Sequence, residues 1–186
     1  MNVVGGSSNQ KPGTAVTFSF DVPQSGLYKL ALRVKQNYRD GLPSYRKIAV
    51  DGQVPFAEFT EYKFKNSGNW RTEVLSAEDG VPYLLYLESG AHTLTLTAIQ
   101  ADYYALNKIL KTDAQTLSDL LLKIRKITGN DPDYNYDYHL DTQIPDMLDT
   151  FRQLEDSMER MMSMISDISG QTTAKYNELK NMIDQL

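Results

Sequence analysis

Cysteine is absent from the 186-residue sequence, so disulfide bridges, thiolate zinc sites and a thiol nucleophile are all excluded. Long apolar runs are absent too, because no stretch approaches the roughly eighteen consecutive apolar residues that a membrane-spanning helix needs. The first residues also lack the basic and apolar segments of a signal peptide. We therefore expect no membrane span in this segment, and we expect any export signal to lie upstream or to have been removed.

An excess of basic charge is lacking as well. The sequence carries 19 Lys and Arg residues against 24 Asp and Glu residues, a formal net charge of −5, and its basic residues are scattered. A surface that binds nucleic acid shows clustered basic residues, so nucleic acid is not an expected partner.

Residues suited to catalysis are scarce. His92 is expected at the polar-facing end of a strand and His139 in a loop, and neither has a second member of a nucleophilic or metal-binding group beside it. A glycosidase is a disfavoured alternative, because the carboxylate separation that defines its catalytic pair cannot be read from a sequence. We expect no catalytic residue, no metal site and no cofactor, and hence a chain that is not an enzyme.

The composition changes near residue 100. Nine of the eleven glycines lie before this point, whereas six of the seven methionines lie after residue 140. Residues 1–99 hold ten basic and nine acidic residues, and residues 100–186 hold nine basic and fifteen acidic residues. We therefore predict two domains, at 1–100 and 101–186.

Alternation of apolar and polar residues marks the strands of the first domain. Strands are predicted at 15–22, 27–35, 45–50, 56–64, 70–75, 82–88 and 92–98. In the second of these, the alternation places Tyr28, Leu30, Leu32 and Val34 on one face and Lys29, Arg33 and Lys35 on the other. Asp51-Gly52 supplies the two positive-φ positions of a tight turn. Short strands with turn signals between them favour an antiparallel sandwich or jelly roll.

From about residue 102 the apolar residues recur at the spacing of a helix. The first helix is expected to begin within about a turn of residue 102 and to end at Gly129. A second is predicted at 141–169, with Pro145 in its first turn, and a third at 172–186. The predicted fold class is α+β: an antiparallel β-sandwich or jelly roll, then a long helical hairpin with a third helix, forming a coiled-coil-like arm.

Several motifs of the first domain resemble galactose-binding-like carbohydrate-binding modules over nearly all of residues 15–98. They are Val16–Arg33, Val50-Asp51-Gly52, Asn69-Trp70 and Ser89–Leu96. A closer resemblance takes in Gln36-Asn37-Tyr38, Ser44-Tyr45-Arg46, Val54-Pro55-Phe56, Pro82-Tyr83, Ile127-Thr128-Gly129 and Gln143-Ile144-Pro145. Together these residues look like the accessory domain in large extracellular solute-binding proteins of carbohydrate ABC importers from Firmicutes.

This resemblance implies a bacterial, extracellular and cell-surface-associated protein. It also implies two partners, a carbohydrate and the other domains of a parent solute-binding protein. In that architecture the helices look like an insertion before a closing strand of the sandwich. Such a strand is absent from the sequence.

Trp70 is the first candidate for sugar binding, because sugar sites use an aromatic face and planar polar side chains. It is the only tryptophan, and its position matches the tryptophan-bearing segment of the modules that the domain resembles. The alternative is that Trp70 starts a strand and packs into the core. The second tryptophan usual in the family is missing, and Glu73 or Val74 stands in its place.

The loop from Gln36 to Ser44 supplies the other candidates. Tyr38 and Tyr45 flank it, Arg39 lies within it, and Asn37 and Arg46 stand beside the two tyrosines. The alternative is a solvated loop with one tyrosine folded inward. The candidate carbohydrate-binding residues are thus Trp70, Tyr38, Tyr45, Asn37 and Arg46.

Two further motifs are better explained by structure than by ligand binding. The alternating Asp131, Asp133, Asn135 and Asp137 are like the start of a calcium loop, but Tyr136 and Thr142 stand where that loop needs Gly and Glu. The interleaved Tyr134, Tyr136 and Tyr138 are expected to pack this turn onto a neighbouring surface. The methionines at 158–164 are expected to fill the core between helices rather than to form a binding groove.

Two functions follow from these observations. The first is a non-catalytic accessory module of a larger extracellular protein, which binds carbohydrate in connection with sugar import. The alternative is a structural or protein-interaction arm without sugar affinity, which binds through exposed apolar helix surface.

Overall fold

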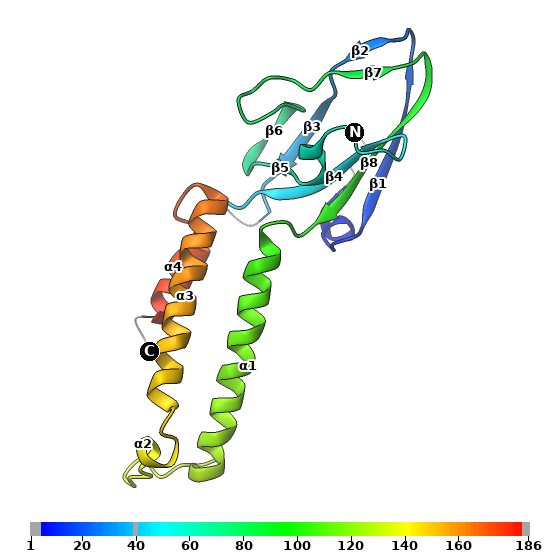
Figure 1. Cartoon of the computed structure of the whole chain (residues 1–186). Helices are drawn as coiled ribbons and strands as arrows, with labels where there is room; N and C mark the ends of the chain where they lie inside the picture. The colour runs from blue at the N-terminus through cyan, green and yellow to red at the C-terminus, as the bar shows by residue number, and fades with distance from the viewer. Residues whose placement is uncertain (1–4, 39–40, 184–186) are drawn as a thin grey trace. The chain divides into compact units, whose positions relative to one another are not determined.

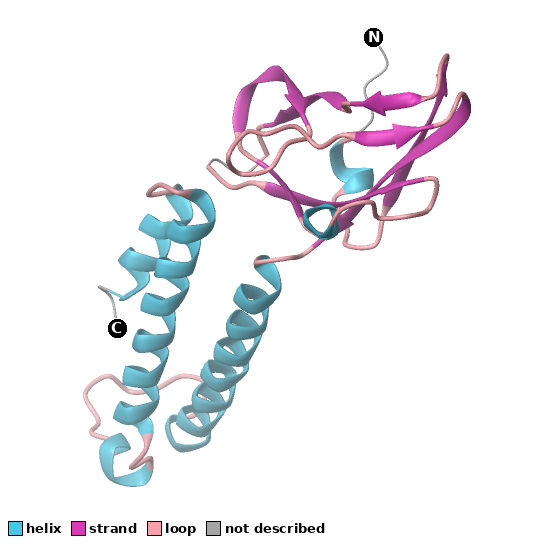
Figure 2. Cartoon of the chain, turned by 45° about the horizontal axis from the view of Figure 1, so that its top comes forward, coloured by secondary structure: helices cyan, strands magenta, loops and turns pink. Residues whose placement is uncertain are grey.

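The computed structural model describes residues 5–38 and 41–183. The chain divides into two compact units, Met1–Ala101 and Asp102–Leu186. Figure 2 shows strands in the first unit and long helices in the second. The α+β fold class predicted from the sequence is confirmed.

The first unit is a β-sandwich of two antiparallel layers (Figure 1). Its strands are β1 (Ala15–Val22), β2 (Gly26–Tyr28), β3 (Ala31–Gln36), β4 (Ser44–Val50), β5 (Tyr62–Phe64), β6 (Ser67–Val74), β7 (Leu85–Leu87) and β8 (Gly90–Ile99). One layer is a sheet of order β1-β8-β4-β5, and the other consists of the pairs β2-β7 and β3-β6. The amide of Leu75 donates to the carbonyl of Leu30 at 2.9 Å, and the amide of Tyr83 donates to the carbonyl of Leu75 at 3.0 Å, so the layer continues between the two pairs.

The core lies between the layers and takes apolar residues from both. Its most deeply buried side chains are Phe59, Ile48 and Leu75. Tyr28, Leu30, Leu32 and Val34 pack against this core as their alternation predicts. Two apolar layers with such a core form a sandwich because each sheet buries one face and leaves the other in water.

Two predicted strands are interrupted. The strand predicted at 27–35 is divided at Lys29-Leu30, because its partner strand is itself broken by the connection at 76–84 between β6 and β7. The strand predicted at 56–64 begins instead with the single 3-10 turn η2 (Ala57–Thr60), which buries Phe59.

The tight turn predicted at Asp51-Gly52 is confirmed. Both residues have positive φ, 51° and 78°. Val50 and Gln53 exchange backbone hydrogen bonds of 2.8 and 2.9 Å across the turn. Asp51 also accepts from the amide of Thr93 at 2.7 Å, which fixes the turn to β8.

His92 does not lie on the polar face predicted for it. Its register partner is Phe20, on which its ring stacks at a centroid distance of 5.7 Å. Its Nδ1 lies 2.6 Å from a carboxylate oxygen of Asp51 and its Nε2 lies 2.8 Å from the carbonyl of Glu88. Both neighbours accept hydrogen bonds, so the ring satisfies both only as imidazolium. The hydrogen bond to Asp51, followed by that to Glu88, raises the pKa of His92.

Within its described residues, the second unit contains two long helices and two shorter ones. They are α1 (Tyr103–Thr128), α2 (Leu140–Gln143), α3 (Met147–Ser169) and α4 (Ala174–Ile183). The start of α1 and the glycine ends at Gly129 and Gly170 are confirmed, and both glycines have positive φ. The helix predicted to run unbroken over 141–169 is interrupted, because Pro145 lacks an amide hydrogen and disfavours helical geometry at Ile144.

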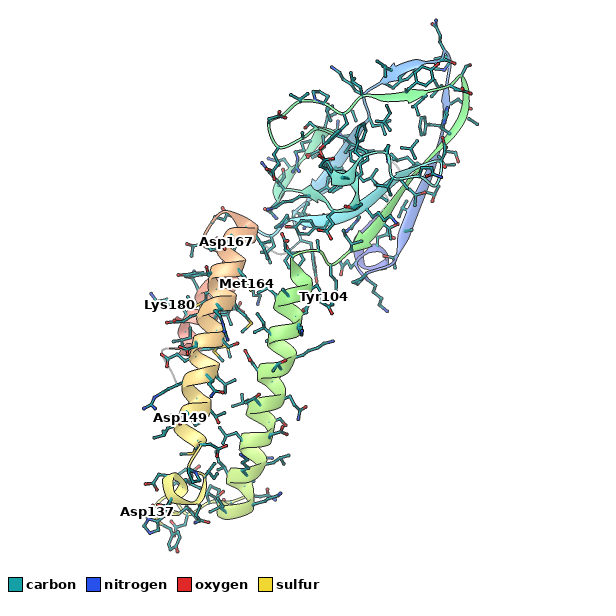
Figure 3. The ribbon with its side chains drawn as sticks, viewed as in Figure 1. Tyr104, Asp137, Asp149, Met164, Asp167 and Lys180 are labelled. Atoms are coloured by element: carbon teal, nitrogen blue, oxygen red, sulfur yellow. The ribbon has the colours of Figure 1, made fainter. Side chains whose placement is uncertain are left out.

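Helices α1 and α3 pack through buried apolar residues and one polar contact. Leu120 of α1 and Leu154, Met158 and Met161 of α3 are buried, and Figure 3 shows Met164 on the side of α3 that faces α1. The hydroxyl of Ser157 donates to the carboxylate of Asp113 at 2.6 Å between the two helices. The methionines of α3 that are buried here fill the core, as the helical spacing predicts.

The loop between α1 and α2 differs from its prediction. Tyr134 and Tyr136 are exposed, and the ring of Tyr136 packs edge-on against Tyr138 of the same loop at a centroid distance of 4.8 Å. Tyr138 holds the loop instead, because its hydroxyl accepts from the amide of Asp133 at 2.9 Å. Among residues 5–38 and 41–183, no three acidic, histidine or cysteine side chains are grouped so that they could hold a metal ion. Within the same residues, no helix has the length and apolar character needed to cross a membrane.

We predict that Phe59→Ala lowers the free energy of unfolding by about 3–5 kcal/mol, because it removes a buried ring and leaves a cavity. Urea unfolding followed by circular dichroism measures the change. Phe18→Ala is the matched control, since the Phe18 side chain is 39% exposed and its loss is expected to cost much less. Equal losses would contradict the assignment of the core.

We predict that stability falls as the pH rises through the folded-state pKa of His92. The pKa of His92 is raised above its ordinary 6.5, so the stability it contributes is present below 6.5 and is lost above its folded value. Asp51→Asn, followed by urea unfolding between about pH 6 and 9, is expected to flatten this dependence. Asp21→Asn, on an exposed residue of β1, is expected to leave it unchanged. A slope that survives in Asp51→Asn would contradict the pairing.

Candidate functional site

In the layer formed by β2, β3, β6 and β7, the side chains that point away from the core, with that of Lys29 between β2 and β3, form one surface, here named the outer face. It carries Leu27, Lys29, Ala31, Arg33 and Lys35 on one side and Trp70, Thr72, Val74 and Tyr86 on the other. The register places Leu27 opposite Tyr86, Ala31 opposite Val74 and Arg33 opposite Thr72. Directly opposed residues share a face of the sheet, so these side chains project together.

Trp70 lies on the outer face and is 39% exposed. It is absent from the core cluster, so the alternative in which Trp70 packs into the core is not what the structure shows. It is two residues from Thr72 and therefore a diagonal neighbour of Arg33, about 7–8 Å away and within reach of a long side chain. An exposed indole beside a guanidinium and a hydroxyl offers both ring stacking and hydrogen bonds to a sugar.

The inner side of the strand that presents Trp70 carries an ion pair between two residues of that strand. The guanidinium Nε of Arg71 donates to the carboxylate of Glu73 at 2.7 Å, and Nη2 of Arg71 donates to the carbonyl of Lys65 at 3.0 Å. Glu73 therefore points inward, whereas Val74 points outward on the face of Trp70. Of the two residues that stand for the missing second tryptophan, only Val74 is on the outer face.

Tyr38 and Asn37 follow β3 directly and are both exposed, Tyr38 at 55%. The side-chain amide of Gln36 donates to the carbonyls of Tyr38 at 3.0 Å and of Leu42 at 3.3 Å, which ties the loop together. Gln36 pairs with Ser67, so Asn37 and Tyr38 lie at the end of the β3-β6 pair where β6 begins. Arg39 lies outside the described residues.

The prediction for Tyr45 is wrong. Its side chain lies on β4, in the other layer of the sandwich, and is only 4% exposed. Stacking on a sugar requires an exposed ring face, which this burial removes. Tyr45 therefore serves packing.

Arg46 is occupied by backbone contacts. Its Nη1 donates to the carbonyl of Tyr45 at 2.8 Å and its Nη2 to the carbonyl of Asn9 at 3.3 Å. Burial lowers the pKa of the Arg46 guanidinium. The structure therefore places Trp70, Asn37 and Tyr38 in one layer and Tyr45 and Arg46 in the other, and does not join all five in one site.

Sequence reasoning missed the rest of the outer face. Lys29, Arg33 and Lys35 were assigned to one face of their strand, but Tyr86 and Thr72 were not placed beside them. The described residues of the outer face include three cations, Lys29, Arg33 and Lys35, and no carboxylate. The segment from Leu27 to Lys35 spans about 26 Å at 3.3 Å per residue, so Trp70 and Tyr86 lie far apart on this face.

Comparison with known proteins gives one match to a family model. Residues 105–186 match the model of the bacterial solute-binding protein, 4-helix bundle domain. This match confirms the resemblance to solute-binding proteins predicted from the sequence. No curated protein matches the chain.

Some solved structures are similar to half of the chain. A cycloisomaltooligosaccharide glucanotransferase from Paenibacillus sp., complexed with cycloisomaltoheptaose, is 30% identical over 50% of this chain and 12% of that chain, with a TM-score of 0.40. A family 35 carbohydrate binding module from Clostridium thermocellum is 20% identical over 50% of this chain and 64% of that chain, with a TM-score of 0.38. Another from an environmental isolate is 15% identical over 50% of this chain and 60% of that chain, with a TM-score of 0.36. The chain thus spans less than two thirds of the length of each of these proteins.

We predict that Arg46→Ala lowers the free energy of unfolding by about 1–3 kcal/mol, because two backbone carbonyls lose a charged donor. The change is measured by urea unfolding. The same variant is expected to keep the ligand affinity of the outer face, which lies in the other layer. A loss of ligand affinity without a loss of stability would instead indicate that Arg46 contacts the ligand.

Proposed function

We propose that the first unit is a non-catalytic carbohydrate-binding module and that Trp70 is its main stacking residue, with Arg33 and Thr72 beside it. The observation that carries this proposal is the exposure of the single tryptophan on the outer face, where core packing would have buried it. A partly exposed indole on a sheet face offers an aromatic surface on which a sugar can stack, beside side chains that can hydrogen-bond its hydroxyls. The sequence motifs of residues 15–98, which resemble carbohydrate-binding modules, support the same reading.

The proposed setting is a larger extracellular solute-binding protein at the bacterial surface. The match of residues 105–186 to a domain of bacterial solute-binding proteins supports this setting. In such a protein the module would raise the local concentration of a sugar chain near the importer. Asn37 and Tyr38, exposed at one end of the β3-β6 pair, are proposed as additional sugar contacts.

Titration of neutral and acidic oligosaccharides, followed by tryptophan fluorescence, tests this proposal. All tryptophan emission comes from Trp70, because it is the only tryptophan in the sequence. We expect a ligand to shift the emission and Trp70→Ala to weaken binding, measured by calorimetry, by about tenfold or more, since truncation of a central tryptophan of a binding surface costs about 2 kcal/mol or more. Arg33→Ala is expected to weaken binding less.

Tyr104→Ala serves as the matched control, because Tyr104 is an exposed aromatic residue of α1. It is expected to bind as the unsubstituted protein does. An emission spectrum that no oligosaccharide moves, together with calorimetry that detects no heat of binding, would refute the sugar-binding module and favour the structural arm.

A further inference from the structure

Helix α1 carries an exposed row of apolar residues, here named the α1 stripe. It consists of Leu110, Ala114, Leu117 and Leu121. The spacings of four, three and four residues keep these side chains on one line along the helix. The three leucines are 54%, 44% and 44% exposed. Such a row is the seam that one helix offers to another.

The α1 stripe borders the side of α1 that already faces α3. That side carries Ile109, Thr116, Leu120, Ile124 and Ile127, which are buried or half-buried. At about 100° per residue, this side and the stripe together form an arc of about 160°. One neighbouring helix covers only part of such an arc. Helix α3, by contrast, has two neighbouring helices, because it packs against both α1 and α4.

The number of helices agrees with one unfilled helix position beside α1. The matching family model describes a 4-helix bundle, whereas the described residues contain three helices longer than one turn, α1, α3 and α4. Each helix of such a bundle lies beside two others. Since α3 has both of its neighbours, the open side of α1 is where the remaining helix fits.

The charges define the chemistry of this missing helix. Helix α1 holds five basic and two acidic residues, a net charge of +3, and α3 holds two basic and five acidic residues, a net charge of −3. The flank of the stripe that points away from α3 carries Asn107, Lys111, Ser118 and Arg125, without a carboxylate. A second copy of α1 would bring like charges together along this flank, which disfavours self-pairing.

We propose that the α1 stripe docks an amphipathic helix whose apolar row is flanked by carboxylates, supplied by another part of the parent solute-binding protein. The parent protein belongs to the proposed function, but the sugar-binding face is not needed for this docking. Apolar contact gives the affinity, and Lys111 and Arg125 select an acidic partner over a basic one.

Two synthetic helical peptides of about three heptads test the proposal. They share the same leucine row and carry either Glu or Lys at every flanking position. Fluorescence anisotropy of each labelled peptide is measured with the whole 186-residue protein. We expect the Glu peptide to bind at least about tenfold more tightly than the Lys peptide, since like charges brought together across an interface cost several kcal/mol.

Variants on α1 localise the binding. Leu117→Glu with Leu121→Glu is expected to weaken binding of the Glu peptide by at least about tenfold. Leu122→Glu is the matched control and is expected to keep the affinity, because Leu122 is an exposed leucine of the same helix that lies off the stripe. Lys111→Glu with Arg125→Glu leaves every leucine in place and is expected to reverse the preference between the two peptides. Circular dichroism confirms that each variant is folded.

Three outcomes would overturn the proposal. Equal affinity for both peptides would refute the preference for an acidic partner. Equal weakening of binding by Leu122→Glu would refute the α1 stripe as the docking surface. Sedimentation that shows a dimer dissociated by Leu117→Glu with Leu121→Glu would assign the stripe to a second copy of the chain. A failed oligosaccharide titration bears only on the outer face, so the two proposals fail separately.

Discussion

One strand alternation, along residues 26–36, determines both the core and the outer face of the sandwich. Even-numbered residues point inward and fill the core, and odd-numbered residues point outward and carry the cations beside Trp70. The irregularity between β3 and β6 preserves this division, because two steps on β3, from Val34 to Gln36, face four on β6, from Ser67 to Arg71. Trp70 points outward because it directly precedes Arg71, which lies opposite the inward-pointing Val34.

Polar contacts, rather than apolar packing, fix the inner side of the strand that carries Trp70. Arg71 and Glu73 occupy inward positions and are paired with one another. Below them the hydroxyl of Tyr62 accepts from the amide of Ser76 at 3.2 Å, and burial raises the pKa of Tyr62. Arg71 and Glu73 lie on the same strand, so their pairing satisfies two half-buried charges within that strand. The hydrogen bonds of Arg71 to Lys65 and of Ser76 to Tyr62 connect the strand to the segments beside it.

The features predicted correctly from the sequence depend on neighbours along the chain, such as the turn at Asp51-Gly52 and the helix end at Gly129. Errors arose where distant segments decide. The place of His92 depends on its pairing with Phe20, seventy-two positions earlier, and no local pattern specifies that register. One error was avoidable from sequence alone, because Tyr45 and Arg46 are adjacent on a predicted strand and must point to opposite faces. They were therefore never able to share one sheet surface.

In the helical unit, the width of a helix's apolar arc determines which side chains need a packing partner, as strand alternation does in the sandwich. An arc on a helix measures how many neighbours the helix has, so α3 needs two helices to cover its arc, and α1, with a similar arc, needs two as well. Both are available in a bundle of four. The partly buried hydrogen bond between Ser157 and Asp113 fixes α1 against α3 at one register. Because that register is fixed, the position of the α1 stripe is fixed with it. Any helix that docks there meets a preformed surface, which lowers the entropic cost of binding.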